Sequence, residues 1–410
     1  MIHMETLIHD KLIKTMEITN GNICNHCLGR IFSRDIEGPG NLIRGERLKH
    51  SLEEMGETYS KEDKCEICND LFEKMDELIQ QALEIVEKED INFSNFLVGC
   101  RVDSEVLERE EIIHQKLGAN VENIKKEINR EFGKEIATLL SKEVEFDSPN
   151  IVFMVDFKSE NVEVTINPLF IESKYRKLVR NIPQTKWPCN RCKGRGCEKC
   201  DFTGKMYPET VEELISDVMI KAAKGTGAKF HGAGREDIDV RMLGSGRTFV
   251  LEISEPKIRD LDLENLQTEV NKHAEGKVEI SEMKHVPRNR KAEIKQSSTD
   301  TYKVYKALVK VDDEIDPKDL DSLKAMNVIN QRTPIRVSHR RADKIRVRKV
   351  RKLNYHVLGS KCFEITLECE GGLYIKELIS GDENRSKPSV AEVLGTNAKC
   401  VQLDVLEVNI

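Results

Sequence analysis

The stretch FHGAGREDIDVRMLGSGRTFVLEI, residues 230–253, decides how the C-terminal part of the chain folds. Two glycines precede a charged triplet at 235–237, and apolar and charged residues then alternate. This alternation predicts a strand over 237–242 with one apolar and one charged face. LGSG at 243–246 predicts a turn, and the apolar residues within 249–253 predict a partner strand. We therefore expect a β-hairpin with charged residues at its entry.

Asp237 is the carboxylate that this arrangement favours for chemistry. It lies directly after the glycine-rich loop, at the mouth of the cleft that such a loop would form. On the expected strand it shares a face with Asp239, one pleat deeper. Arg235 is placed to pair with the carboxylate or to hold a phosphate, and Glu236 is expected to point into solvent. The alternative is an ordinary surface turn rich in glycine and charge.

Length and composition indicate a soluble protein of two or three domains. The chain has 410 residues, of which 33% are charged and 39% hydrophobic, a balance typical of globular proteins with a polar surface. No apolar run approaches the ~18 residues of a membrane span. The N-terminal residues lack the apolar core and cleavage site of a signal peptide. We therefore expect a cytoplasmic protein with no membrane partner.

Positive charge is concentrated in one stretch, although the formal net charge is −7. Residues 331–352 hold ten Lys or Arg residues and one acidic residue, Asp343. Isoleucine and valine are interspersed with these charges. The pattern predicts a strand pair with a cationic face suited to phosphate; a solvated face is the alternative. A basic connector at 173–188 carries the only tryptophan, and either a linker or an RNA contact would explain it.

Eight of the twelve cysteines form four C-x-x-C pairs. In a reducing compartment such pairs indicate zinc, because both thiolates of a pair can reach one ion at about 2.3 Å. CNHC and CEIC predict one structural site, in which His26 is a bystander. CNRCKGRGCEKC predicts a second site and resembles the zinc repeats of DnaJ-type co-chaperones; two exposed thiol pairs are the alternative. The expected ligands are Cys24, Cys27, Cys65, Cys68, Cys189, Cys192, Cys197 and Cys200.

Hydrophobic periodicity and capping signals divide the chain into two mixed regions. In the first we expect helices at 4–17, 70–88, 104–117 and 121–140, then two strands within 151–172. In the second we expect helices at 211–222 and 374–381 and strands at 302–311, 362–369 and 400–408. Strands outnumber helices in the second region. The fold class is therefore α+β, with a mixed, mainly antiparallel sheet in the second region.

Several segments together resemble the pseudouridine synthase ten family, which consists chiefly of archaeal and eukaryotic tRNA enzymes. They are GREDIDVRMLGSGRTFVLEI, KYRKLVRNIPQTKWPC, QRTPIRVSHRRAD, GGLYIKELISGDENRSKPSVAEVLG and AKCVQLDVLEV, and the N-terminal C-x-x-C pairs also fit. The resemblance implies a zinc-clipped, THUMP-containing accessory domain that binds tRNA over residues 1–180. A pseudouridine synthase catalytic domain would follow over 181–410. One departure is Thr248, where the family pattern has proline.

The resemblance also implies roles for single residues, motif by motif. Asp237 matches the catalytic aspartate, and Lys376 takes the place of the basic residue that pairs with it. Tyr305, in KVYKALV, matches the tyrosine that stacks on the target base; Tyr302 is a second candidate for that role. The remaining matches are Tyr374 for another tyrosine at the substrate and Leu403 for a leucine of the uracil pocket. Two alternatives stay open for Arg235, which lies two residues before Asp237: it orients the aspartate or it displaces the flipped base.

By this resemblance the chain isomerises uridine to pseudouridine at positions 54 and 55, in the TΨC arm of tRNA, without a cofactor. The reaction breaks the C1′–N1 bond, rotates the uracil and rejoins it to the sugar through C5. It needs a carboxylate beside the glycosidic bond and a cation that favours the charged form of that carboxylate. It also needs apolar and aromatic walls around a flipped-out base.

Two other functions remain open. A zinc-stabilised protein that binds tRNA without acting on it would share all of these features. A THUMP-linked methyltransferase would need a glycine loop between a strand and a helix. Here GTGAKFHGAG, at 225–234, follows an expected helix and leads into an expected strand, which makes the methyltransferase the least favoured function.

Overall fold

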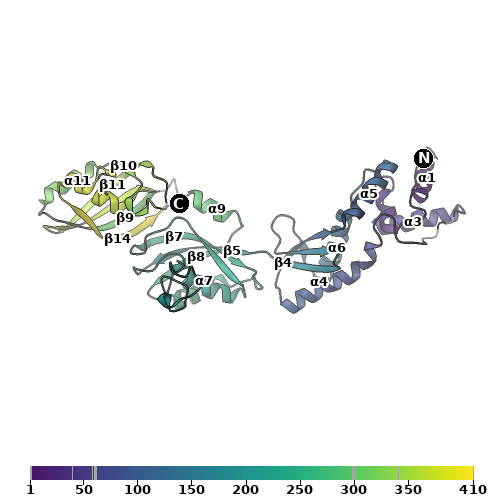
Figure 1. Ribbon diagram of the computed structural model, residues 1–410, viewed down its shortest axis with the longest axis horizontal. Helices are drawn as coiled ribbons and strands as arrows, with labels where there is room; N and C mark the ends of the chain where they lie inside the picture. Colours follow the sequence, from purple (N-terminus) through teal and green to yellow (C-terminus); the bar gives the residue numbers. More distant parts are fainter. Residues whose placement is uncertain are drawn as a thin grey trace. The chain divides into compact units, whose positions relative to one another are not determined.

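The computed structural model describes residues 2–38, 40–57, 59, 62–297, 302–339 and 341–409. The chain divides into two compact units, Met1–Asn167 and Pro168–Ile410 (Figure 1). The division comes earlier than the expected boundary after residue 180, because strand β5 (Leu169–Lys177) pairs with β7 and β8 of the second unit. The basic connector predicted from residue 173 is therefore partly a strand of a sheet.

The first unit packs helices against a four-stranded sheet of order β2-β1-β3-β4. Strand β1 runs parallel to β2 and β3, and β4 runs antiparallel to β3. The four expected helices and the β3–β4 hairpin are present, whereas β1 was not predicted. The elements are α1 (Ile2–Ile18), α2 (Asn25–Ile31), α3 (Asn41–Glu54), η1 (Leu71–Lys74), α4 (Met75–Glu89), β1 (Asn95–Arg101), α5 (Ser104–Leu117), α6 (Ile124–Leu140), β2 (Glu143–Val144), β3 (Ile151–Asp156) and β4 (Asn161–Ile166).

The second unit is built on a ten-stranded sheet of order β13-β10-β11-β12-β9-β14-β7-β5-β8, with β6 paired to β7. Among the described strands of this sheet, the β7–β14 pairing is parallel and the others are antiparallel, which confirms the mixed, mainly antiparallel sheet. Its strands, after β5, are β6 (Gly227–Gly232), β7 (Arg241–Ser254), β8 (Val278–His285), β9 (Tyr302–Val311), β10 (Val328–Arg332), β11 (Ile345–Gly359), β12 (Cys362–Glu370), β13 (Ser386–Lys387) and β14 (Ala398–Val408). Its helices are η2 (Glu198–Cys200), α7 (Val211–Ala222), α8 (Leu263–His273), α9 (Arg290–Ser297), η3 (Pro317–Ala325), η4 (Ile335–Val337), α10 (Ile375–Ser380) and α11 (Val390–Leu394).

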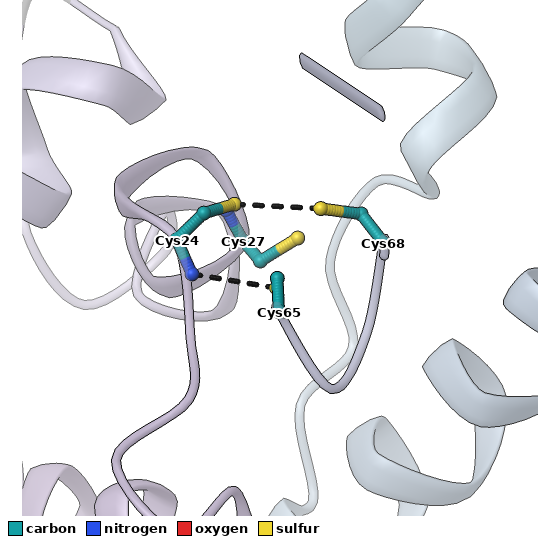
Figure 2. A group of neighbouring side chains, drawn as sticks. All are labelled: Cys24, Cys27, Cys65 and Cys68. Atoms are coloured by element: carbon teal, nitrogen blue, oxygen red, sulfur yellow. Dashed lines mark hydrogen bonds between the residues drawn. The ribbon is translucent and has the colours of Figure 1, made fainter. Parts of the chain in front are cut away.

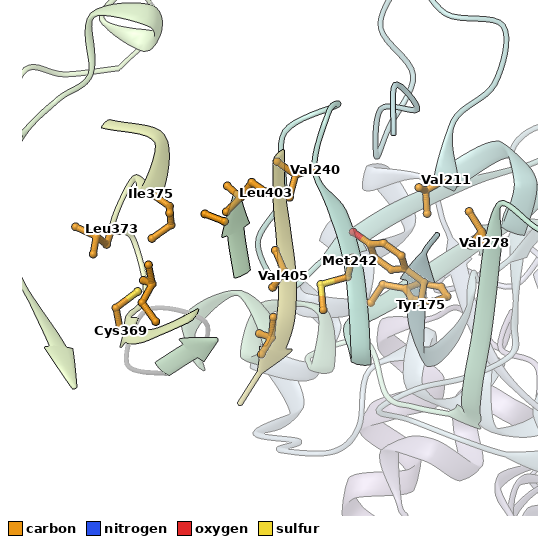
Figure 3. Packing of buried hydrophobic residues seen from close by; sticks show 14 of the residues in the cluster. Tyr175, Val211, Val240, Met242, Val278, Cys369, Leu373, Ile375, Leu403 and Val405 are labelled. Atoms are coloured by element: carbon orange, nitrogen blue, oxygen red, sulfur yellow. The ribbon is translucent and has the colours of Figure 1, made fainter. Parts of the chain in front are cut away.

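Apolar side chains from both halves of this sheet form one core across the junction of β7 and β14. Figure 3 shows Met242 of β7 and Val405 of β14 between Tyr175 on one side and Leu373 on the other. Helix α7, which begins where the Thr210 side chain caps the backbone N–H of Glu213, adds its buried face to the same core. The two halves are therefore joined by packing as well as by strand pairing.

The hairpin in the opening stretch differs from the predicted one. Strand β6 ends at Gly232, residues 233–240 form a loop, and β7 begins at Arg241. The strand predicted over 237–242 and the turn predicted over 243–246 are therefore wrong. Gly244 is needed inside β7 because β14 passes close by: an added Cβ would lie 1.8 Å from the Leu406 carbonyl oxygen.

The basic stretch at 331–352 forms part of β10, the short helix η4 and the first part of β11. Strands β10 and β11 pair antiparallel, so the predicted strand pair is present. Arg332 and Arg385 form ion pairs with Asp343 at one end of the stretch; Arg340 lies outside the described residues. No helix in the described ranges is long and apolar enough to cross a membrane.

Replacing Gly244 by alanine is expected to destabilise the second unit. The residue has φ +60° and its added methyl group would overlap the backbone of β14, so we expect a loss of about 2 kcal/mol or more of unfolding free energy. Urea unfolding followed by circular dichroism measures it. Gly359→Ala is the matched control, because nothing lies within 4 Å of a Cβ there. Equal midpoints for the two variants would contradict the close approach.

Candidate active site

One cavity of about 760 Å³ in the second unit is lined by all six predicted catalytic and substrate residues. Its volume is within the range of pockets for small organic ligands, and it can therefore hold a flipped-out nucleoside. The six residues are Asp237 and Arg235 on the loop 233–240, Tyr305 on β9, Leu403 on β14, Tyr374 immediately before α10 and Lys376 within it.

A buried lysine, Lys177, forms hydrogen bonds with the backbone of the loop 233–240. Lys177, at the end of β5, donates from Nζ to the carbonyl oxygens of Asp237 at 3.2 Å and Ile238 at 3.3 Å. It also donates to the Ile182 carbonyl oxygen at 3.0 Å. These bonds satisfy an ammonium that is fully buried. They fix the main chain on both sides of the Asp237–Ile238 bond.

Glu236 lies beneath the loop in a buried ion pair. Its carboxylate accepts hydrogen bonds from Arg247 Nε and from the Tyr175 hydroxyl, both at 2.9 Å, and its side chain is only 1% exposed. Burial, followed by the Glu236 charge, raises the pKa of Tyr175, so the hydroxyl stays protonated and donates. The prediction that Glu236 points into solvent is wrong, because the loop turns it inward as Asp237 turns toward the cavity.

Two cations face the carboxylate of Asp237. Arg336, on η4, approaches both oxygens: Nη1 lies 3.2 Å from Oδ1 and Nη2 lies 3.1 Å from Oδ2. Lys376 Nζ lies 3.4 Å from Asp237 Oδ2 and closer, at 2.7 Å, to Asp239 Oδ1. Lys376 is thus near Asp237, as expected, but is shared with Asp239. Burial opposes ionisation of Asp239, yet Lys376 outweighs it and lowers its pKa.

Arg336 is the residue of this site that sequence reasoning missed. It lies inside the quoted segment QRTPIRVSHRRAD, but nothing local distinguishes it from the other arginines there. Its position comes from Glu377 on α10, whose Oε1 accepts a hydrogen bond from Arg336 Nε at 2.5 Å. Burial alone would lower the pKa of Arg336, and the Glu377 and Asp237 carboxylates raise it. Arg336 is therefore a fixed, permanently charged partner.

Arg235 lies near an aromatic ring and forms no ion pair with the aspartate in the described ranges. Its guanidinium lies 6.0 Å from the ring centroid of Trp187. Trp187 in turn packs edge-on against Tyr207, with ring centroids 5.6 Å apart. An orienting role for Arg235 is therefore not supported by its contacts. The exposed arginine on an aromatic ring is instead placed to meet a ligand that enters the cavity.

The tyrosines of the cavity come from different elements. Tyr305 lies on β9, where burial raises the pKa of its hydroxyl. The hydroxyl therefore stays protonated, and Tyr305 forms an uncharged part of the cavity wall. Tyr374 directly precedes α10, and its ring centroid lies 5.8 Å from the guanidinium carbon of Arg336. Tyr302, the second candidate for base stacking, is not among the residues of the cavity wall; it packs under the guanidinium of Arg351.

Chemically, the cavity presents one reactive group. The side chain of Asp237 is 35% exposed, so a ligand can reach it, and its carboxylate forms ion pairs with Arg336 and Lys376. Such a carboxylate can act as a nucleophile or as a base. Aromatic and apolar side chains around it can hold a planar base.

The first cysteine group, in the first unit, has the geometry of a tetrahedral zinc site. In Figure 2 Cys24 and Cys27 face Cys65 and Cys68 from two separate segments. All four sulfurs lie within 4.8 Å of one another, and those of Cys24 and Cys68 are 3.5 Å apart. A Zn–S length of about 2.3 Å requires sulfurs roughly 3.8 Å apart. Arg30 Nη2 donates to Cys27 Sγ at 3.4 Å, a contact that suits a thiolate.

The second cysteine group, in the second unit, fits the same geometry. Sulfur–sulfur distances are 3.9 Å for Cys189–Cys197, 3.9 Å for Cys192–Cys200 and 3.7 Å for Cys197–Cys200. Backbone N–H groups point at two of these sulfurs, as at Cys192 Sγ, which accepts from Gly196 N at 3.2 Å. The predicted pairs are therefore two four-sulfur groups, each able to hold a structural zinc ion with no open position for water.

Comparison with known proteins gives matches along nearly the whole chain. The family model described as "Pus10, C-terminal" matches residues 170–409, and "Pus10 THUMP domain, archaeal" matches 78–156. The tRNA pseudouridine synthase Pus10 of Methanothermobacter marburgensis is 50% identical, covering 98% of this chain and 98% of its own. The proteins of that name from Methanosphaera stadtmanae and Methanocaldococcus jannaschii are each 40% identical, covering 98% and 99% of this chain and 99% and 98% of their own. The crystal structure of a Cbf5–Nop10–Gar1 complex is similar only at a TM-score of 0.32 and 15% identity, over 57% of this chain and 48% of that one.

Replacing Glu236 by alanine is expected to destabilise the second unit strongly. Arg247 is 2% exposed and would lose its carboxylate partner, which typically costs about 3–5 kcal/mol. Thermal unfolding measures the loss. The control is Glu275→Ala, which removes an exposed glutamate from the turn after α8. If both variants unfold at the same temperature, the buried ion pair does not hold the loop.

Proposed function

This chain belongs to the Pus10 family of tRNA pseudouridine synthases, and we propose that it converts uridines 54 and 55 of the TΨC arm of tRNA to pseudouridine, with Asp237 as the nucleophile or base. The observation that carries the proposal is the placement of Asp237. It is the reachable carboxylate of a nucleoside-sized cavity and faces two cations, Arg336 and Lys376. Isomerisation of uridine itself is the activity of the family.

The charges around Asp237 support its role in each stage of the reaction. Arg336 and Lys376 form ion pairs with the Asp237 carboxylate before substrate enters. Asp237 then acts beside the C1′–N1 bond, either on the sugar, on the base or on a proton. The electron pair of that bond leaves with uracil. After rotation, C5 bonds to C1′ and loses its proton, and N1 takes up a proton, so product and substrate are isomers. No electrons enter or leave overall, so the reaction needs no redox partner.

The remaining predicted residues would hold the base. Tyr305 and Leu403 lie on the neighbouring strands β9 and β14 and supply an aromatic and an apolar surface. Tyr374 and Arg235 lie nearer the loop and helix ends that border the cavity. A base must leave its stack to reach such a site, which costs free energy, and stacking on aromatic side chains offsets part of that cost.

The first unit would bind tRNA, and both cysteine groups would hold structural zinc. Residues 78–156 match the archaeal Pus10 THUMP domain, and we assign tRNA binding to the accessory domain around it, the first unit Met1–Asn167. The cysteine groups fit zinc by sulfur spacing and by donors to sulfur. Because each group has four sulfurs, the metal would stabilise local folds and take no part in the reaction.

Asp237→Asn is expected to lower the single-turnover rate by at least about 10²–10⁴-fold, because the amide is neither a base nor a nucleophile. The assay incubates the protein with an unmodified tRNA transcript and maps pseudouridine at each position. Affinity for tRNA should change by less than about 1 kcal/mol, since phosphate contacts dominate it. Asp260→Asn, in an exposed loop, is the control. Tight binding of wild-type protein without any pseudouridine would instead support the binding protein without activity; product only outside 54 and 55 would overturn the positions.

Purified protein is expected to contain two zinc ions per chain, measured by mass spectrometry of the metal. Cys24→Ser should remove one ion and lower the unfolding temperature, because a tetrahedral site loses a ligand. Cys362→Ser, which changes a cysteine outside both groups, should leave both ions bound. Absence of metal after purification under reducing conditions would contradict the zinc assignment.

A further inference from the structure

Lys303 is a nearly buried lysine in the wall of the catalytic cavity. It lies on β9, is 8% exposed, and lines the cavity together with Tyr305. Residues two apart on a strand point to the same face, so both side chains rise from β9 into the same space. Lysine is almost never buried without a partner. The reaction described above gives Lys303 no task.

The ammonium of Lys303 lies directly under the catalytic loop. A Cβ added at Gly234 would lie 3.7 Å from Lys303 Nζ and 3.0 Å from Arg247 Nη1. Gly234 has φ +84°, so the absence of a side chain there both permits the turn and leaves room above the two cations. Lys303 Nζ therefore lies close to Gly234, which lines the cavity three residues before Asp237 in the loop.

The charge of Lys303 is not matched by a side-chain contact in the part of the chain that the structure describes. Among the described residues, no hydrogen bond or ion pair holds its ammonium, whereas the neighbouring Arg247 is satisfied by Glu236. Burial and then the Arg247 charge lower the pKa of Lys303 to about 8. Burying the charged form of Lys303 therefore costs free energy, and a hydrogen bond to an electron-rich ligand would offset part of that cost.

The position of Lys303 favours a base over a phosphate. A phosphate would meet the exposed cations Arg235, Arg341 and Lys344 at the outer part of the site. Lys303 lies instead among the buried β9 and β14 positions, with Tyr305 and Leu403, where the uracil is expected. The electron-rich atoms of uracil in that space are its carbonyl oxygens.

We propose, building on the pseudouridine synthase function above, that Lys303 donates a hydrogen bond to a carbonyl oxygen of the detached uracil and stabilises its negative charge. When the C1′–N1 bond breaks, its electron pair stays on the uracil and spreads from N1 onto O2 and O4. A buried ammonium that already points at this space stabilises that charge without reorganisation. Lys303 keeps its proton. The negative charge disappears when C5 bonds to C1′; the C5 proton then leaves to a base and N1 takes up a proton.

Lys303→Met tests the proposal, because it keeps the length of the side chain and removes the charge. We expect the single-turnover rate to fall by about 10²–10³-fold, with tRNA affinity unchanged. The unfolding temperature should stay the same or rise, because a buried charge without a partner is lost. Lys310→Met removes an exposed lysine from the same strand and is the control. A rate within threefold of wild type overturns the proposal, provided that wild type forms pseudouridine; if wild type forms none, the function itself fails.

The pH profile separates a catalytic from a structural role. The groups acting on Lys303 are Arg247 of β7, Glu236 of the loop and Cys369 of β12, whose own pKa is raised by burial to about 12. Lys303 is charged below pH about 8, so the wild-type rate should fall as pH rises through that value. This fall should be absent from Lys303→Met. If that variant does not fold, Lys303→Arg should shift the decrease in rate to higher pH, because arginine keeps its charge there. A decrease at the same pH as in the wild type overturns the proposal.

Discussion

The buried ion pair between Glu236 and Arg247 is the interaction on which the catalytic loop depends. Neighbouring acids in one loop have opposite environments: Glu236 is bound by Arg247 and Tyr175 inside the protein, and Asp237 faces the cavity. A loop of eight residues has no ladder of backbone bonds to hold it, so side chains must do so. Lys177 completes the arrangement by binding carbonyl oxygens of the loop. Two consecutive residues therefore have different tasks: Glu236 stabilises the loop, and Asp237 faces the cavity where the reaction is proposed to take place.

The charges of the cavity come from segments far apart in the chain. Arg336 lies on η4 and is oriented by Glu377 of α10, which also carries Lys376. These groups meet Asp237 only after β10, β11, β12, β9 and β14 have assembled in one sheet. The electrostatic environment of the aspartate is thus a property of the tertiary fold, and each half of the sheet alone lacks it.

Local signals in the sequence predicted much of the fold. Helix α5 and strand β9 have the bounds that periodicity predicts, and the capping box at Thr210 marks the start of α7. The motif residues lie in one cavity, as the resemblance implies. The sequence misleads where a partner is distant: apolar and charged residues alternate over 237–242, which predicts a strand, although residues 237–240 belong to the loop before β7. Burial of Glu236 depends on Arg247 and Tyr175, and the position of Arg336 depends on Glu377. Neither of these interactions produces a periodic pattern in the sequence.

The pairing of β7 with β14, the one parallel pairing between described strands of the second unit, is also the line along which the catalytic sheet could bend. Only two residue pairs join these strands, Asp404 with Arg241 and Val405 with Met242, and Asp404 additionally pairs with Arg180. Asp237 belongs to the half on one side of that line, whereas its cations belong to the other. The width of the cleft and the charge balance at the carboxylate are therefore coupled mechanically: a change in twist at β14 would alter both at once, and it would also strain the apolar core that the two halves share.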